Sequence, residues 1–119
     1  MIPVWPKAER AAYLRERLRP ERLLDDLENR ATRCNRPHVV LIGIKGSSSE
    51  WTEVREVVGP QFRREIEDDP EITSMLNAFR EIGFDIDWGG YSDPTGEEFD
   101  LRIYRDEEAE RRLKAKIEP

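Results

Sequence analysis

The spacing of apolar residues changes at Gly83, and this change limits the folds that the chain can adopt. Before Gly83, apolar side chains recur every three or four positions, the spacing of one helical face: Ile72, Met75, Leu76, Phe79 and Ile82. After Gly83 they alternate with polar residues, as in strands that bury one face. The two patterns together predict an α+β fold, with a small sheet packed by helices.

Three segments carry strand patterns. Residues 38–44 are mostly β-branched and apolar with no helical period, which predicts a buried central strand. Residues 84–88 and 99–104 alternate, and the turn-rich segment 89–96 between them predicts an antiparallel hairpin with a long loop. We therefore expect a mostly antiparallel sheet of about three strands.

Helices are predicted on both sides of the first strand. Residues 6–34 predict two helices broken near Pro20, which we expect to form a helical hairpin. The core-facing stripe of the second helix is expected to hold Leu23, Leu24, Leu27, Ala31 and Cys34. Another helix is predicted from about Ser48 to Val58, with Gly59-Pro60 as its end.

Two more helices complete the predicted order, which is helix, helix, strand, helix, helix, strand, strand, helix. Asp69, Pro70 and Gly83 delimit the clearest one. The last runs from Asp106 to about Ile117.

The length of 119 residues fits one domain, with the helical hairpin at 1–36 and the sheet with its packing helices at 38–119. The N-terminus lacks a signal-peptide pattern and no apolar stretch reaches the roughly 20 residues of a membrane span, so we expect a cytoplasmic protein. One cysteine and one histidine exclude an internal disulfide and a thiolate zinc site. We expect no cofactor and no catalytic residue, and a homo-oligomer is compatible with the sequence.

Negative charge is concentrated in the second half of the chain. Residues 1–60 carry 11 basic and 9 acidic side chains, whereas residues 61–119 carry 9 basic and 17 acidic ones. We expect Asp85, Asp87 and Asp100 to face water from one side of the predicted hairpin. Crowded like charges need solvent, a cation or a basic partner to relieve their repulsion.

The leading hypothesis is an acidic binding protein of the inhibitor or adaptor type. Its partner would be a basic protein surface, such as that of a protein that handles nucleic acids. The predicted partner-binding residues lie on the hairpin and its connector: Asp85, Asp87, Tyr91, Asp93, Glu97, Glu98 and Asp100. Tyr91 would serve as an aromatic anchor. The alternatives for the same carboxylates are a solvated face and a magnesium or calcium site.

A second hypothesis is an anion or nucleotide site at the predicted strand-to-helix junction. Free amides at a helix N-terminus suit a phosphate or carboxylate, and the candidate residues are Lys45, Gly46, Ser47, Ser48 and Ser49. The spacing is not that of a phosphate-binding loop, so a plain serine cap is the competing interpretation. Gly-x-Ser-x-Gly is absent, which argues against a serine nucleophile.

A weaker hypothesis is nucleic-acid binding through the arginine-rich N-terminal helices. Acidic residues interleave with these arginines at spacings that permit intrahelical pairs, so a mixed solvated surface is expected instead.

From His38 onward the predicted element order resembles the KH RNA-binding module, and Gly43-Ile44-Lys45-Gly46 has its Gly-x-x-Gly form. The KH module places that motif between its two adjacent helices, whereas here it follows the first strand. The acidity of this segment also opposes RNA binding, so no functional residue is carried over.

Overall fold

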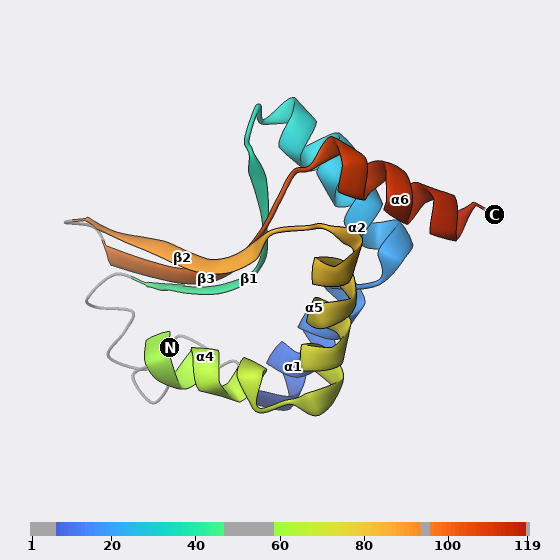
Figure 1. Cartoon of the computed structure of the whole chain (residues 1–119). Coiled ribbons are helices and arrows are strands. Elements are labelled where there is room, and N and C mark those ends of the chain that lie inside the picture. Colours follow the sequence, from blue (N-terminus) through green and yellow to red (C-terminus); the bar gives the residue numbers. More distant parts are fainter. Residues whose placement is uncertain (1–6, 47–58, 94–95, 119) are drawn as a thin grey trace.

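The computed structural model describes residues 7–46, 59–93 and 96–118. It confirms the α+β class and the predicted order of elements. Figure 1 shows that α1 and α4 lie below the sheet, that α5 stands at its end, and that α2 and α6 lie beyond that end. Strands β2 and β3 extend away from α5 and pass above α4, where Phe62 packs edge-on against Trp88.

The helices and strands have the following bounds. The helices are α1 (Lys7–Arg17), α2 (Pro20–Asp26), the π-helical turn η1 (Leu27–Ala31), α4 (Gly59–Glu67), α5 (Pro70–Ile82) and α6 (Glu107–Ile117). The strands are β1 (His38–Gly46), β2 (Ile86–Asp93) and β3 (Gly96–Tyr104), in the antiparallel order β1-β3-β2.

Capping residues set the bounds of the later helices as the sequence predicted. Asp69 accepts a hydrogen bond from the Ile72 amide at 3.0 Å, and Pro70 begins α5. Gly83 ends α5 with a φ of 125°, a left-handed conformation that favours glycine. At α6, Asp106 accepts from the Ala109 amide at 2.8 Å.

The segment that begins at Gly59 differs from its prediction. Gly59-Pro60 was expected to end a helix, but α4 begins there and runs to Glu67. Proline fits the first turn of a helix, because its missing amide hydrogen has no partner there, and Phe62 and Ile66 lie one turn apart and are both buried. The helix predicted at 48–58 lies outside the described residues.

Cys34 was predicted to lie on the core-facing stripe and is instead exposed. Leu23, Leu27 and Ala31 are buried as expected. Between Leu27 and Ala31 the chain makes a π-helical turn, which shifts the phase of the residues that follow it. Asn35, with a φ of 50°, lies in the turn that follows, so Cys34 is left beyond the buried face.

The prediction that residues 38–44 form the central strand is wrong, because β3 occupies the centre of the sheet. The segment is apolar for a different reason. A β-bulge between Val40 and Ile42 adds one residue to β1. Both Leu41 and Ile42 are buried, since α1 and η1 contact β1. Side chains from both halves of the chain, from Leu14 to Leu113, join in one buried cluster.

Within the described residues, no helix has the length and apolar character required to cross a membrane.

Candidate binding surfaces

The register of the sheet brings the predicted acidic residues of the hairpin together. Asp87 lies opposite Arg102, and Gly89 lies opposite Asp100. Since residues directly opposite, and residues two apart on a strand, share a face, Asp87, Asp100 and Arg102 lie on one face. Asp85, just before β2, and Asp87 are both exposed.

The other predicted hairpin residues are placed by their backbone pairing alone. Tyr91 pairs with Glu98, Asp93 pairs with Gly96, and Glu97 pairs with Ser92. All four predicted residues therefore belong to the paired strands rather than to a long loop, and Tyr91 lies directly across from an acidic residue.

Asp100 departs from the expectation of a water-facing carboxylate. Its exposed fraction is 0%, and its two oxygens accept hydrogen bonds from Arg102, at 2.6 Å from Nε and 3.2 Å from Nη2. Its neighbours on the adjacent strands are Gly43 and Gly89, so the forked ion pair lies flat against the sheet. Asp100 is thus part of the internal structure of this face.

The pairing of Arg102 with Asp100 determines the charge that the face presents. The hydrogen bond to Asp100 raises the pKa of Arg102, so the guanidinium remains charged. Nε and Nη2 of Arg102 are both directed at Asp100, and Asp87 forms no ion pair with any described residue. Asp87 Oδ1 accepts instead from the Trp88 amide at 2.8 Å. Asp85 and Asp87 are therefore exposed without an ionic partner among the described residues.

A sequence signal for this pair existed and was missed. Asp100 and Arg102 are two residues apart in a predicted alternating strand, which places opposite charges side by side on one face. The roles of Gly43 and Gly89 had no such signal, because they depend on which strands become neighbours.

His38, the single histidine, lies half-buried at the start of β1. Its ring lies 5.4 Å from that of Tyr104, its partner in the sheet, and Nδ1 is buried without a hydrogen bond to a described residue. Burial lowers the pKa of His38, and the nearby Arg102 lowers it further. The imidazole of His38 thus packs within the sheet, against the ring of Tyr104.

The predicted anion site lies mostly outside the described residues, which exclude Ser47, Ser48 and Ser49. Of the remaining two candidates, Lys45 pairs with Glu98 and Gly46 pairs with Glu97 in the backbone register. Both candidates therefore extend β1 alongside acidic positions of β3.

Most of the N-terminal arginines whose contacts are described are engaged within the protein. Arg10 pairs with Glu65, Arg15 with Asp69 and Glu71, and Arg17 with Asp26. Arg19 and Arg22 approach Glu16, and Arg30 approaches Asp26. Arg10 and Arg17 are buried, contrary to the predicted solvated surface. Buried guanidinium groups are not available to contact phosphates.

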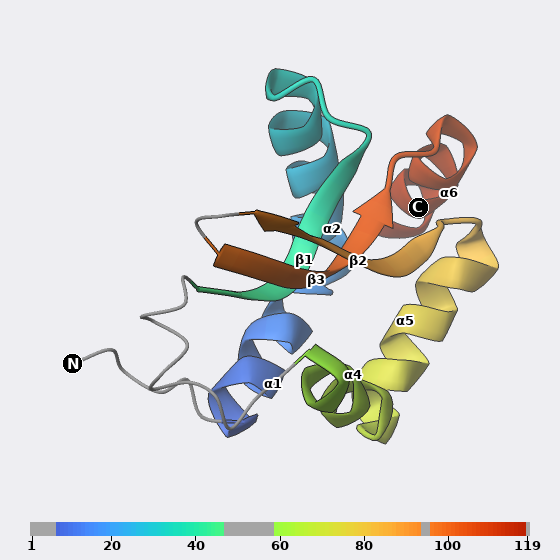
Figure 2. The ribbon, with the colours of Figure 1, turned by 90° about the vertical axis from the view of Figure 1, so that its left-hand side faces the viewer.

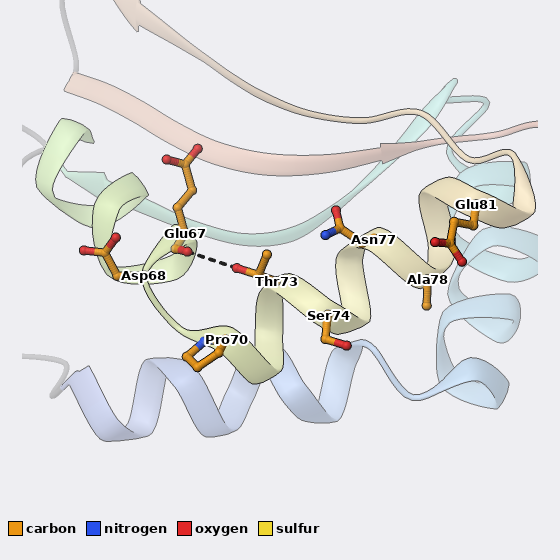
Figure 3. Close-up of a pocket in the computed structure, with 8 residues that line it drawn as sticks. All are labelled: Glu67, Asp68, Pro70, Thr73, Ser74, Asn77, Ala78 and Glu81. Atoms are coloured by element: carbon orange, nitrogen blue, oxygen red, sulfur yellow. Dashed lines mark hydrogen bonds between the residues drawn. The ribbon is translucent and has the colours of Figure 1, made fainter.

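A shallow groove of about 780 Å³ runs along the outer side of α5 and was not predicted from the sequence (Figure 3). Its polar lining includes Glu67, Asp68, Thr73, Asn77 and Glu81, and the Thr73 hydroxyl donates to the Glu67 carbonyl at 3.0 Å. None of the residues that line it is basic, so it lacks the cations of an anion site. A second groove of about 530 Å³ lies between α5 and α6, and its lining includes Glu81 together with the basic residues Arg112 and Lys116.

Among the residues that the structure describes, no three His, Cys, Asp or Glu side chains are grouped as a metal site requires. The sequence matches no protein-family model, and comparisons with curated proteins and with solved structures gave no match.

Proposed function

We propose that this chain is a small cytoplasmic binding protein that presents the acidic β2–β3 hairpin to a basic surface of a partner protein. The supporting observation is that Asp87 is exposed and has no ionic partner among the described residues. It lies across from Arg102, yet that arginine is directed at the buried Asp100, so Asp87 and the neighbouring Asp85 are exposed without an ionic partner among the described residues.

The charge of the chain supports the same proposal. The excess of acidic residues in 61–119 generates a negative field that attracts basic surfaces over about 8 Å at physiological salt. In the register of the strands, the positions of Tyr91, Asp93 and Glu98 fall on the face of Asp87 and extend the proposed binding surface, whereas the position of Glu97 falls on the opposite face. Asp100 contributes indirectly, because it holds Arg102 away from Asp87.

The test uses the two exposed carboxylates, because reversing the buried Asp100 would disrupt the fold. The double variant Asp85→Lys/Asp87→Lys and the wild-type chain are each used to capture proteins from a lysate of the native host, and bound proteins are identified by mass spectrometry. The affinity of the captured partner is then measured by titration calorimetry at low and high salt. We expect the double variant to lose the partner and the wild-type affinity to fall with salt.

A matched control makes the same change of charge elsewhere. Glu28 and Glu118 are exposed and form no ion pair with any described residue, so Glu28→Lys/Glu118→Lys alters net charge equally without altering the hairpin. Equal loss of the partner in both double variants would show that only net charge matters and would reject the hairpin as the site.

The alternative at Lys45 to Ser49 predicts a different result. A nucleotide bound there would raise the melting temperature of the protein, and at 100 times its dissociation constant it would add about 2.7 kcal/mol of stability. A shift with nucleotide and magnesium that is unchanged in Asp85→Lys/Asp87→Lys would favour the junction over the hairpin.

A further inference from the structure

The sheet has two edge strands, β1 and β2, and the backbone groups along an edge are open to pairing with another chain unless something covers them. The two edges of this sheet are covered to different extents.

At Val40 and Leu41 the β1 edge is covered by α1. The guanidinium of Arg17 donates to the carbonyl oxygens of Val40 at 3.0 Å and Leu41 at 3.3 Å. The β-bulge between Val40 and Ile42 also interrupts the regular spacing that a pairing strand needs. The middle of the β1 edge is therefore a poor template for another strand.

Along β2, the direction of each backbone group follows from one hydrogen bond. The Tyr104 amide donates to the Asp85 carbonyl at 2.9 Å, so Asp85 points its carbonyl toward β3. Alternate residues of a strand direct their amide and carbonyl groups to opposite sides. Ile86, Trp88, Gly90 and Ser92 therefore direct theirs away from β3, toward the open edge.

Of the side chains that the structure describes, those that bond to this outer edge do so at its beginning. Arg80 Nη2 donates to the Ile86 carbonyl at 3.3 Å, and Asp87 Oδ1 accepts from the Trp88 amide at 2.8 Å. From the Trp88 carbonyl through Ser92, no hydrogen bond from a described residue reaches the outer edge. Figures 1 and 2 show that β2 begins beside α5 and then runs away from it.

We propose that the partner adds an extended, basic segment to the outer edge of β2, from Trp88 to Ser92, as a fourth strand. This inference rests on the proposed function and specifies how the basic partner binds. Main-chain hydrogen bonds would supply affinity, and Asp85 and Asp87, exposed at the covered end of the edge, would select cationic side chains on the added strand.

A second copy of this chain is a poorer occupant of the same edge. Antiparallel pairing of two β2 strands about Gly90 would set Asp87 of one copy opposite Asp93 of the other. Like charges directly opposite one another are destabilising, so the charge pattern favours a basic partner over self-association.

The test uses a ten-residue peptide of alternating Lys and Thr as probe, and follows backbone amides of the wild-type protein by NMR. We expect the amides of Gly90 and Ser92 to shift and to gain protection from hydrogen exchange. A peptide of the same sequence with every backbone nitrogen methylated keeps its charge but can no longer donate main-chain hydrogen bonds. We expect its dissociation constant to be at least about tenfold higher, since more than one hydrogen bond is lost.

Variants of Ser92 test the edge from the protein side. Ser92→Pro removes the amide hydrogen that points to the outer edge, and an edge strand tolerates proline at such a position. Ser92→Ala is the control, because it keeps this amide hydrogen. We expect only Ser92→Pro to weaken peptide binding. Should Ser92→Pro not fold, the comparison of the two peptides on wild-type protein decides alone.

The possible outcomes separate this inference from the proposed function. Equal binding of the plain and methylated peptides, together with loss of the partner in Asp85→Lys/Asp87→Lys, would overturn strand addition and leave the acidic hairpin as the site. Retention of the partner by Asp85→Lys/Asp87→Lys would overturn both. A stable dimer through β2 in analytical ultracentrifugation would overturn the choice of occupant.

Discussion

The guanidinium of Arg102 lies over the backbone of Gly89, so closely that a β-carbon at Gly89 would stand 2.9 Å from Arg102 Cζ. On the other side of β3, a β-carbon at Gly43 would stand 3.0 Å from Asp100 Cβ and 3.3 Å from the Phe99 carbonyl oxygen. The two glycines make the space in which the forked ion pair lies flat on the sheet.

Alanine substitutions at the two glycines should differ in cost. Gly43→Ala would meet a β-carbon and a backbone oxygen that cannot move aside, and overpacking of this kind costs about 1–3 kcal/mol of unfolding free energy. Gly89→Ala would meet Arg102 Cζ and Nε at 2.9 Å, and the guanidinium can move aside only by loosening its bonds to the buried Asp100. Because weakening a buried ion pair costs more than overpacking does, we expect Gly89→Ala to be the more destabilising in urea denaturation, and the reverse order would contradict this description of the site.

The ion pair of Arg102 and Asp100 should show strong energetic coupling. Arg102, with 19% of its side chain exposed, covers a carboxylate that is fully buried. Arg102→Met leaves that charge without a partner, which costs about 3 kcal/mol or more. Asp100→Asn/Arg102→Met removes the charge as well, so we expect it to be more stable than Arg102→Met alone. Additive effects in this double-mutant cycle would show that the pair contributes little.

Local patterns in the sequence were sufficient to predict the helices that have their own caps, the hairpin and the α+β class. Asp69 and Gly83 determine the ends of α5 through bonds within a few residues, so no tertiary information was needed. The position of β1 at an edge was not predictable in this way. Its apolar run arises from a bulge and from the helices α1 and η1 that contact it.

The candidate site was predictable in outline but not in its charge. The clustering of Asp85, Asp87 and Asp100 follows from strand alternation. Which carboxylates remain exposed depends on whether Arg102 forms its ion pair with Asp87 or with Asp100. The pair with Asp100 forms in the space left by the neighbouring glycines.

The stability of the protein should depend on the protonation of His38. Burial and the charge of Arg102 lower the pKa of His38 in the folded state below its ordinary value of 6.5. The unfolded chain therefore binds this proton more readily. The stabilisation that neutral His38 adds to the free energy of unfolding is fully present above pH 6.5. It is lost as the pH falls through the lowered folded-state pKa.

The variant His38→Gln isolates this contribution. We expect the unfolding free energy of the wild type to fall more steeply than that of His38→Gln between pH 7.5 and pH 5, measured in urea at constant ionic strength. Parallel curves for the two proteins would exclude His38 as a source of the pH dependence.

Cys34 should react with a thiol reagent in the native protein. Its side chain is exposed beyond the π-helical turn, whereas a cysteine on the buried stripe would react only after unfolding. We expect one equivalent of Ellman's reagent to react at the same rate in buffer and in urea below the unfolding transition. A rate that rises in step with unfolding would place Cys34 in the core after all.

Arg17 should be among the most sensitive positions of the fold, because one guanidinium joins α1 to both α2 and the β1 edge. With 3% of its side chain exposed, it donates to Asp26 Oδ2 at 3.1 Å, to the Tyr13 hydroxyl at 2.8 Å and to the carbonyls of Val40 and Leu41. Arg17→Met would leave a buried carboxylate and two edge carbonyls without this donor, at a cost of about 3–5 kcal/mol.

Two comparisons test the role of Arg17. Arg19→Met removes an exposed arginine that contacts Glu16 only at the surface, and we expect it to change stability by about 0.5 kcal/mol or less. Arg17→Lys keeps the charge, but an ammonium group lacks the planar fork that reaches four acceptors, so it should recover only part of the loss. Because Arg17 also covers the β1 edge, Arg17→Met should aggregate during refolding more than a core variant of equal stability. Equal aggregation of the two would mean that Arg17 stabilises the fold without protecting this edge.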